Sequence, residues 1–168
     1  MIYKIFSYKK VNSTNDIAIK KIKKGFTRGL VQAGFQKKGR GQRGKKWISH
    51  KGNLFISIFF KINKKITVKN ITFKNCNKIK KVISKLINKK LTIKRPNDLL
   101  LNKKKICGIL QETTTYNNSL FMVLGIGINL IKSPKIINYS TTNILDEVGI
   151  NVSKKIIIKN IINEFKYN

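Results

Sequence analysis

The segment Leu54–Ile62 constrains the fold more than any other part of the chain. Its sequence, Leu-Phe-Ile-Ser-Ile-Phe-Phe-Lys-Ile, is almost entirely apolar and rich in β-branched and aromatic side chains. A short run of this length and composition is typical of a strand that is buried inside a sheet. The rest of the chain must therefore supply neighbouring strands and the elements that cover them.

Strand and helix patterns alternate around this segment. Further strands are predicted at residues 2–8, 30–35, 91–93, 99–101, 106–110 and 120–130, and helices at residues 12–25, 70–87 and 156–165. The polar turn at residues 102–104 suggests a hairpin between two of the short strands. This mixed order predicts an α/β or α+β domain, in which helices flank a mixed or antiparallel sheet.

Length and composition limit the classes of protein to be considered. With 168 residues, of which 41% are hydrophobic, the chain suits a single folded domain. No apolar run reaches the roughly 18 residues of a membrane span, and the first residues lack the pattern of a signal peptide. We therefore expect a cytoplasmic protein. Cys76, Cys107 and the single His50 lack the spacing of a zinc site.

The net charge of +31 is a separate argument, because a strongly basic chain often binds nucleic acid. Nearly all of the positive charge is lysine, however, and it is spread along the whole sequence together with abundant isoleucine and asparagine. This pattern is typical of compositional drift in an AT-rich coding sequence. Clusters of the rarer arginines, acids and glycines are therefore more informative than the lysines.

Residues 39–47, Gly-Arg-Gly-Gln-Arg-Gly-Lys-Lys-Trp, form the first such cluster. Three glycines allow the backbone to approach a ligand closely, and the guanidinium groups of Arg40 and Arg43 suit phosphate oxygens. The segment is not a Walker A loop, and a strand rather than a helix is predicted after it, which argues against a dinucleotide-binding turn. Taken alone, it is equally compatible with a flexible surface loop or an RGG-like contact to nucleic acid.

Three further segments carry polar or glycine signals next to predicted strands. Residues 94–98 contain Pro-Asn-Asp, which is a simple turn unless Asp98 orients a ligand or helps to hold magnesium. Residues 105–112 begin at Lys105 and place Gly108 inside a strand, which indicates that another group approaches the backbone closely. Residues 125–129 contain two glycines, which a bulge or tight core packing would also explain.

In this order and spacing, these segments resemble the biotin–protein ligase family. The matching stretches are residues 13–15, 36–47, 52–57, 96–98, 105–112 and 125–129. The resemblance extends from about Tyr3 to the final predicted helix. It implies the fold of the class II aminoacyl-tRNA synthetases and lipoate ligases, a mixed β-sheet flanked by helices.

The resemblance also implies a two-step reaction. Biotin and ATP with Mg²⁺ would give biotinyl-5′-AMP, and a lysine of the biotin carboxyl carrier protein of acetyl-CoA carboxylase would then accept the biotinyl group. No residue of the chain is assigned as a metal ligand. Specific DNA binding and membrane association are not expected, and a homodimer remains open. Residues 1–168 would be one catalytic domain, without an N-terminal helix-turn-helix domain and with the C-terminal SH3-like domain absent or truncated.

The family's functional positions can be carried over residue by residue. Catalytic roles fall on Lys105 and Arg40. The residues expected to bind biotin are Ser13, Thr14, Asn15, Gln36, Gly39, Arg40, Lys105 and Gly108, and those expected to contact ATP or the adenylate are Arg43, Lys45, Trp47, Asn97, Asp98 and Asn129. By resemblance, Lys105 stabilises charge at the reacting phosphate, and the loop closes over the intermediate.

Three positions depart from the family pattern, and three other functions remain alternatives. Gln42 and Lys45 stand where arginine is frequent, and Arg95 replaces a tryptophan; Gln42 suggests weaker retention of the adenylate. The alternatives are a lipoate or octanoate transferase of the same superfamily, a basic nucleic-acid-binding protein, and an inactive remnant of a ligase.

Overall fold

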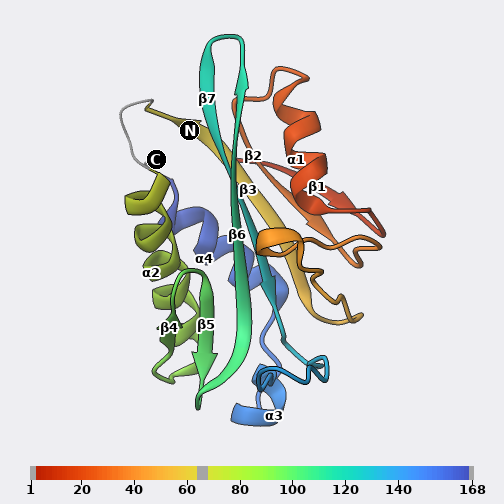
Figure 1. Cartoon of the computed structure of the whole chain (residues 1–168), viewed down its shortest axis with the longest axis vertical. Coiled ribbons are helices and arrows are strands. Elements are labelled where there is room, and N and C mark those ends of the chain that lie inside the picture. Colours follow the sequence, from red (N-terminus) through yellow and green to blue (C-terminus); the bar gives the residue numbers. More distant parts are fainter. Residues whose placement is uncertain (1–2, 64–67, 167–168) are drawn as a thin grey trace.

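The computed structural model describes residues 3–63 and 68–166, and within them seven strands form one mixed sheet (Figure 1). The strand order is β1-β2-β3-β7-β6-β5-β4; only β1 and β2 run parallel, and every other pair is antiparallel. The strands are β1 (Lys4–Tyr8), β2 (Arg28–Ala33), β3 (Leu54–Ile62), β4 (Thr92–Lys94), β5 (Asp98–Leu101), β6 (Lys104–Tyr116) and β7 (Ser119–Ile128). The predicted fold class, a mixed sheet flanked by helices, is confirmed.

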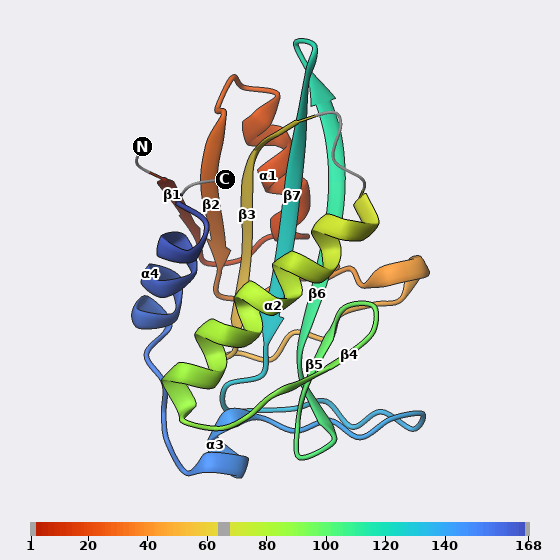
Figure 2. The ribbon, with the colours of Figure 1, turned by 90° about the vertical axis from the view of Figure 1, so that its left-hand side faces the viewer.

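Helices cover both faces of this sheet (Figure 2). The long helix α2 (Val68–Ile87) and α4 (Lys154–Glu164) pack on one face, and α1 (Thr14–Ile22) packs on the other. Because side chains of a strand point alternately to the two faces, β3 must be apolar at nearly every position. Ile58 belongs to the larger core beneath α2 and α4, whereas its neighbour Phe59 packs with Ala18 and Ile22 of α1. The predicted buried strand is confirmed with its predicted bounds.

The predicted hairpin at residues 102–104 is present, but the following strand is longer than predicted. Asn102 and Lys103 have positive φ angles of 49° and 62°, as a tight hairpin turn requires, and they join β5 to β6. β6 continues through three threonines to Tyr116, far beyond the predicted end at residue 110. These threonines favour a strand without being apolar, so the apolar pattern ended before the hydrogen-bonded ladder with β7 did.

A short helix, α3 (Ile144–Val148), was not predicted at all. The side chain of Asn143 caps it by accepting a hydrogen bond from the backbone N–H of Asp146 at 2.9 Å, and Gly149, with φ of 74°, ends it. These capping signals were readable in the sequence. A helix of five residues nevertheless contains too few turns to show apolar periodicity.

Glu147 of α3 supports a prediction about acid stability. It accepts hydrogen bonds from Asn102, Lys104 and Thr142, and these lower its pKa below the ordinary value of 4.5. A carboxyl group with a lowered pKa in the folded chain stabilises it above the unfolded pKa, and this contribution disappears as the pH falls through the folded value. The native chain should therefore melt at a higher temperature than Glu147→Gln above about pH 5, with a margin that shrinks as the pH falls further. A margin that stays constant down to about pH 2 would contradict the assignment.

Both cysteines lie in the core. Cys76 and Cys107 are buried and free, and burial raises the pKa of Cys76 to about 11 and that of Cys107 well above its ordinary value. They therefore behave as apolar core residues rather than as nucleophiles or ligands. Among the described residues, no helix has the length and hydropathy to cross a bilayer.

Candidate functional site

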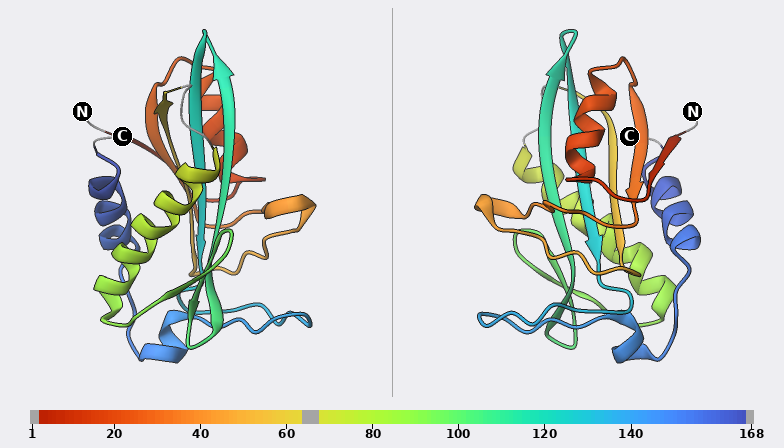
Figure 3. Two further views of the ribbon diagram at one scale, coloured as in Figure 1. Left: turned by 60° about the vertical axis from the view of Figure 1, so that its left-hand side comes forward. Right: turned by 90° about the vertical axis from the view of Figure 1, so that its right-hand side faces the viewer.

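A cavity of about 270 Å³ lies on the sheet beside the first turn of α1. The segment of residues 39–47, here called the glycine-rich loop, projects from the same side of the sheet as residues 131–142 (Figure 3). The cavity is lined by Ser13, Thr14, Asn15, Gln36, Arg40, Gly41, Gln42, Arg43, Lys45, Lys46, Trp47, Lys94, Arg95, Pro96, Asn97, Asp98, Lys105, Gly108, Ile109, Leu110, Gly125, Ile126, Gly127 and Tyr139. Five of the six matching stretches thus meet at one place, since only residues 52–57 contribute no lining residue.

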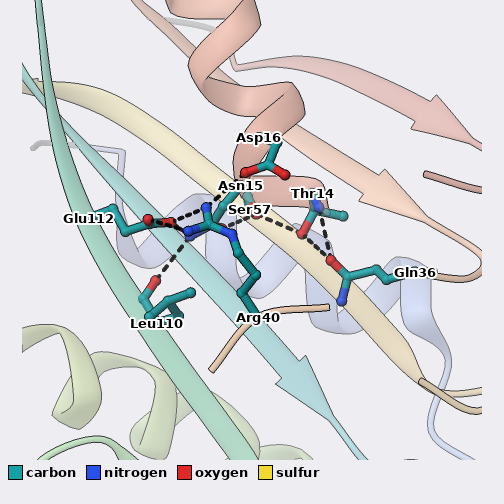
Figure 4. A network of polar contacts seen from close by, with 8 residues as sticks. All are labelled: Thr14, Asn15, Asp16, Gln36, Arg40, Ser57, Leu110 and Glu112. Carbon is teal, nitrogen blue, oxygen red and sulfur yellow. Dashed lines mark hydrogen bonds and ion pairs between the residues drawn. The ribbon is translucent and has the colours of Figure 1, made fainter. Parts of the chain in front are cut away.

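One end of the cavity is a buried polar network (Figure 4). The carbonyl oxygen of the Gln36 side chain accepts from the backbone N–H of Thr14 at 2.8 Å and lies 3.0 Å from its hydroxyl. Ser57 of β3 joins this network from the sheet, with its Oγ 2.8 Å from Thr14 Oγ1 and 2.5 Å from Asn15 Oδ1. All four side chains are buried. They therefore present fixed donors and acceptors, which suits a small neutral polar group.

Trp47 forms another wall, where it lies against two glycines. Gly108 of β6 and Gly127 of β7 are partners across the two strands. A β-carbon added to Gly108 would lie 2.5 Å from Trp47 Cζ3, and one added to Gly127 would lie 2.5 Å from Trp47 Cε2. The close approach predicted at Gly108 is confirmed, and the approaching group is the indole, which also lies against Gly127. Its buried Nε1 has no hydrogen-bond partner.

Lys105 stands between a carboxylate and two aromatic rings. Its Nζ is 2.8 Å from Asp98 Oδ1, and the two side chains are only 14% and 21% exposed. The same ammonium group lies 5.4 Å from the centroid of Trp47 and 5.3 Å from that of Tyr139. Asp98 was predicted to contact the nucleotide, but in this state it pairs with Lys105. Tyr139 was not predicted, because it lies in an irregular segment without a recognisable pattern.

Arg40 is held by two carboxylates rather than left free. Its guanidinium group pairs with Asp16 at 2.8 Å and with Glu112 at 2.7 Å. Burial lowers the pKa of Arg40, but the hydrogen bonds and charges of the two carboxylates outweigh burial and raise it. Neither acid was among the predicted site residues. The signals in the sequence were their rarity, since the chain contains six acidic residues in all, and for Glu112 its place at the end of the matching stretch 105–112.

The remaining predicted residues separate into two groups. Ser13, Arg43, Lys45 and Asn97 line the cavity, although Asn97 donates its amide to the carbonyl of Ile109 at 2.8 Å. Gly39 and Asn129 do not line the main cavity.

Both residues have close backbone neighbours, and Asn129 also lines a small second pocket with Trp47, Lys105 and Tyr139. A β-carbon on Gly39 would lie 2.6 Å from the backbone oxygen of Trp47, so glycine permits the base of the loop to close. Asn129 is 2% exposed and donates to the carbonyl of Thr142 at 3.1 Å, which fixes the chain after β7.

The charge of the lining is strongly positive. Seven cationic side chains, Arg40, Arg43, Lys45, Lys46, Lys94, Arg95 and Lys105, face one carboxylate, Asp98. Such a concave cationic surface attracts anionic ligands. Arg95, one of the departures from the family pattern, places its guanidinium 5.0 Å from the ring of Phe73 on α2. Among the described residues, no three His, Cys, Asp or Glu side chains gather closely enough to hold a metal ion.

Comparisons with known proteins place most of the chain in one family. The model of the biotin/lipoate A/B protein ligase family matches residues 7–129. The bifunctional ligase/repressor BirA of Escherichia coli is 30% identical over 162 residues, which cover 93% of this chain and 50% of BirA. The chain thus spans about half the length of this curated relative.

Solved structures show the same fold. The biotin protein ligase of Aquifex aeolicus in complex with biotin and ATP is 22% identical, with a TM-score of 0.82 over 98% of this chain and 69% of that one. The biotin protein ligase of Leishmania major in complex with biotinyl-5-AMP is 24% identical, with a TM-score of 0.78 over 98% and 74% of the two chains.

Proposed function

Because the chain belongs to the biotin/lipoate A/B protein ligase family, we propose that it is an ATP-dependent biotin–protein ligase. It would activate biotin as biotinyl-5′-AMP and transfer the biotinyl group to a lysine of the carrier protein of acetyl-CoA carboxylase. One observation carries the proposal: a single cavity joins a buried neutral polar network to a cluster of cationic side chains. Biotin has this polarity, with a neutral ureido ring at one end and a carboxylate at the other.

The cavity suits the first step because that step brings two anions together. The carboxylate of biotin must approach the α-phosphate of ATP, and positive side chains lower the repulsion between them. Lys105 is the best placed, since it is largely buried and its surroundings hold it in position. In our proposal Lys105 exchanges its contact with Asp98 for the reacting carboxylate and phosphate oxygens. Thr14, Asn15 and Gln36 hold the ureido ring.

The loop and the nucleotide complete the proposed site. Arg43, Lys45 and Trp47 line the cavity; in our proposal the first two would contact the phosphates and Trp47 the adenylate. Mg²⁺ would enter with ATP and would lower the negative charge of the triphosphate. We propose that these elements work as one catalytic domain, in which strands of one sheet, the start of α1 and the connecting loops together line the cavity. The carrier protein and ATP would be met in the cytoplasm.

Biotin-dependent exchange of labelled pyrophosphate into ATP tests this function in the full chain. We expect exchange only when biotin and Mg²⁺ are both present, because adenylate formation is reversible while the intermediate is bound. Biotin should also raise the melting temperature, whereas lipoate should not. Stabilisation and exchange with lipoate or octanoate, but not with biotin, would replace the proposal by the lipoate branch of the family. No exchange with any of these acids would exclude an active ligase.

A further inference from the structure

Glu112 connects the glycine-rich loop, the first turn of α1 and the sheet (Figure 4). It lies on β6, and both of its carboxylate oxygens are engaged. Oε1 accepts from Arg40 Nη1 at 2.7 Å, while Oε2 accepts from Arg40 Nη2 at 2.7 Å and from Asn15 Nδ2 at 2.6 Å. One side chain therefore holds a residue of the loop and a residue of the polar network together.

The contact to Arg40 fastens the loop to the sheet. Backbone bonds close the loop upon itself, from Trp47 N–H to Gly39 C=O at 2.9 Å and from Gly41 N–H to Lys45 C=O at 2.7 Å. These bonds do not attach it to β6. A bidentate pair between a guanidinium and a carboxylate provides direction as well as attraction. Asp16, which accepts from Arg40 Nη2 at 2.8 Å, holds the same guanidinium from α1.

The contact to Asn15 fixes the orientation of an amide that lines the cavity. Asn15 Oδ1 lies 2.5 Å from the hydroxyl of Ser57, and its Nδ2 points to Glu112. If the amide turned over, its oxygen would face the carboxylate, which is unfavourable. Glu112 thus provides the shorter of two contacts that orient this amide nitrogen, because Nδ2 also donates to the carbonyl of Leu110 at 3.5 Å.

We propose that Glu112 is a positioning residue for the activation of biotin, which fastens the glycine-rich loop through Arg40 and orients Asn15 in the polar end of the cavity. The part of this role that concerns biotin rests on the proposed function. The part that concerns holding the loop does not. This role explains why Glu112 stands beside a cavity whose charged lining residues are cationic except for Asp98. Removing the charge alone, in Glu112→Gln, would turn an amide donor toward the donors of Arg40 or Asn15.

The test compares Glu112→Gln with the matched control Glu164→Gln. Glu164 is also an ion-paired glutamate, 3.4 Å from Lys81, but it lies on α4 away from the cavity. Tryptic cleavage after Arg43, followed by mass spectrometry without ligand, measures how firmly the loop is held. Calorimetric titration measures the affinity for biotin, which depends on how the polar network is oriented. We expect Glu112→Gln to be cleaved roughly fivefold faster and to bind biotin roughly tenfold more weakly, as for the loss of one charge-assisted hydrogen bond. Glu164→Gln should match the native chain in both measurements.

A second variant separates the two contacts of Glu112. In an Arg40→Ala background, Glu112→Gln should not accelerate cleavage after Arg43 further, yet it should still weaken biotin binding through Asn15. Equal cleavage of Glu112→Gln and the native chain would overturn the proposal, as would unchanged biotin affinity in a chain that binds biotin. If the native chain bound no biotin but Glu112→Gln still accelerated cleavage, the proposed function would fail and the role of Glu112 in holding the loop would stand. Similar melting temperatures for both single variants would exclude a merely structural effect.

Discussion

Lys105→Ala is expected to reduce biotin-dependent pyrophosphate exchange by about 10²–10³-fold, the usual cost of removing one group that stabilises developing charge. The reason is position: the ammonium group is largely buried, is paired with Asp98 and lines the same cavity as the polar network. Low local exposure strengthens its interaction with an approaching anion. Exchange rates at saturating ATP and biotin provide the measurement.

Two companion variants exclude a general effect of losing a lysine and an effect of lost stability. Lys104→Ala removes the neighbouring lysine, which pairs with Glu147 outside the cavity, and should retain activity close to that of the native chain. Because Lys105→Ala alone leaves Asp98 without its partner, its melting temperature is measured together with its activity. The double variant Lys105→Ala with Asp98→Asn leaves no unpaired charge and should regain stability but not exchange. Recovery of exchange in the double variant, or equal loss in Lys104→Ala, would contradict the role of Lys105.

Gly127→Ala is expected to lower the same activity by about 10–100-fold, because a displacement of about 1 Å within a site can have effects of this size. The added methyl group would lie 2.5 Å from Trp47 Cε2 and 2.6 Å from Cζ2, and a rigid indole cannot bend away from it. The ring must move, and the cavity wall and the loop must move with it. The rate of pyrophosphate exchange and the KM for ATP would both report the change.

The steric cause can be checked with a variant that removes the ring. Trp47→Ala should itself impair the reaction, but adding Gly127→Ala to it should cause no further loss, because the clash no longer exists. A second loss of the same size in the double variant would show that Gly127 acts through something other than Trp47. In that case the packing of β7 against β6 would be the next place to look.

The sequence was sufficient to predict an element wherever the signal lay within one segment of the chain. β3 could be predicted with its bounds because burial on both faces makes nearly every position apolar. The glycine-rich loop could be predicted because glycine and arginine stand out against a lysine-rich background. The predicted lining residues meet because their segments lie at the ends of adjacent strands and at the start of α1. The mixed sheet followed from the order of the elements, although strand order within it did not.

The partners of charged groups could not be predicted, because pairing depends on distances between segments far apart in the chain. The pairing of Asp98 with Lys105, and of Arg40 with Asp16 and Glu112, arises only when β5, β6, α1 and the loop are brought together. Tyr139 had no signal either, because it lies in an irregular segment without a recognisable pattern. Asn129 matched a family pattern, yet its buried amide holds the chain after β7, a contact that sequence spacing does not reveal.

The position of Trp47 has a consequence for spectroscopy. It is the one tryptophan in the sequence, and its indole lies in the glycine-rich loop against the bare backbone of two strands. Indole emission depends on local polarity and on nearby charge, and here the ring has an unpaired Nε1 and the Lys105 ammonium 5.4 Å from its centroid. Fluorescence excited selectively at tryptophan therefore comes from this single place. The native chain carries an intrinsic optical probe of its loop, and ligand-induced movement can be followed in it without any label.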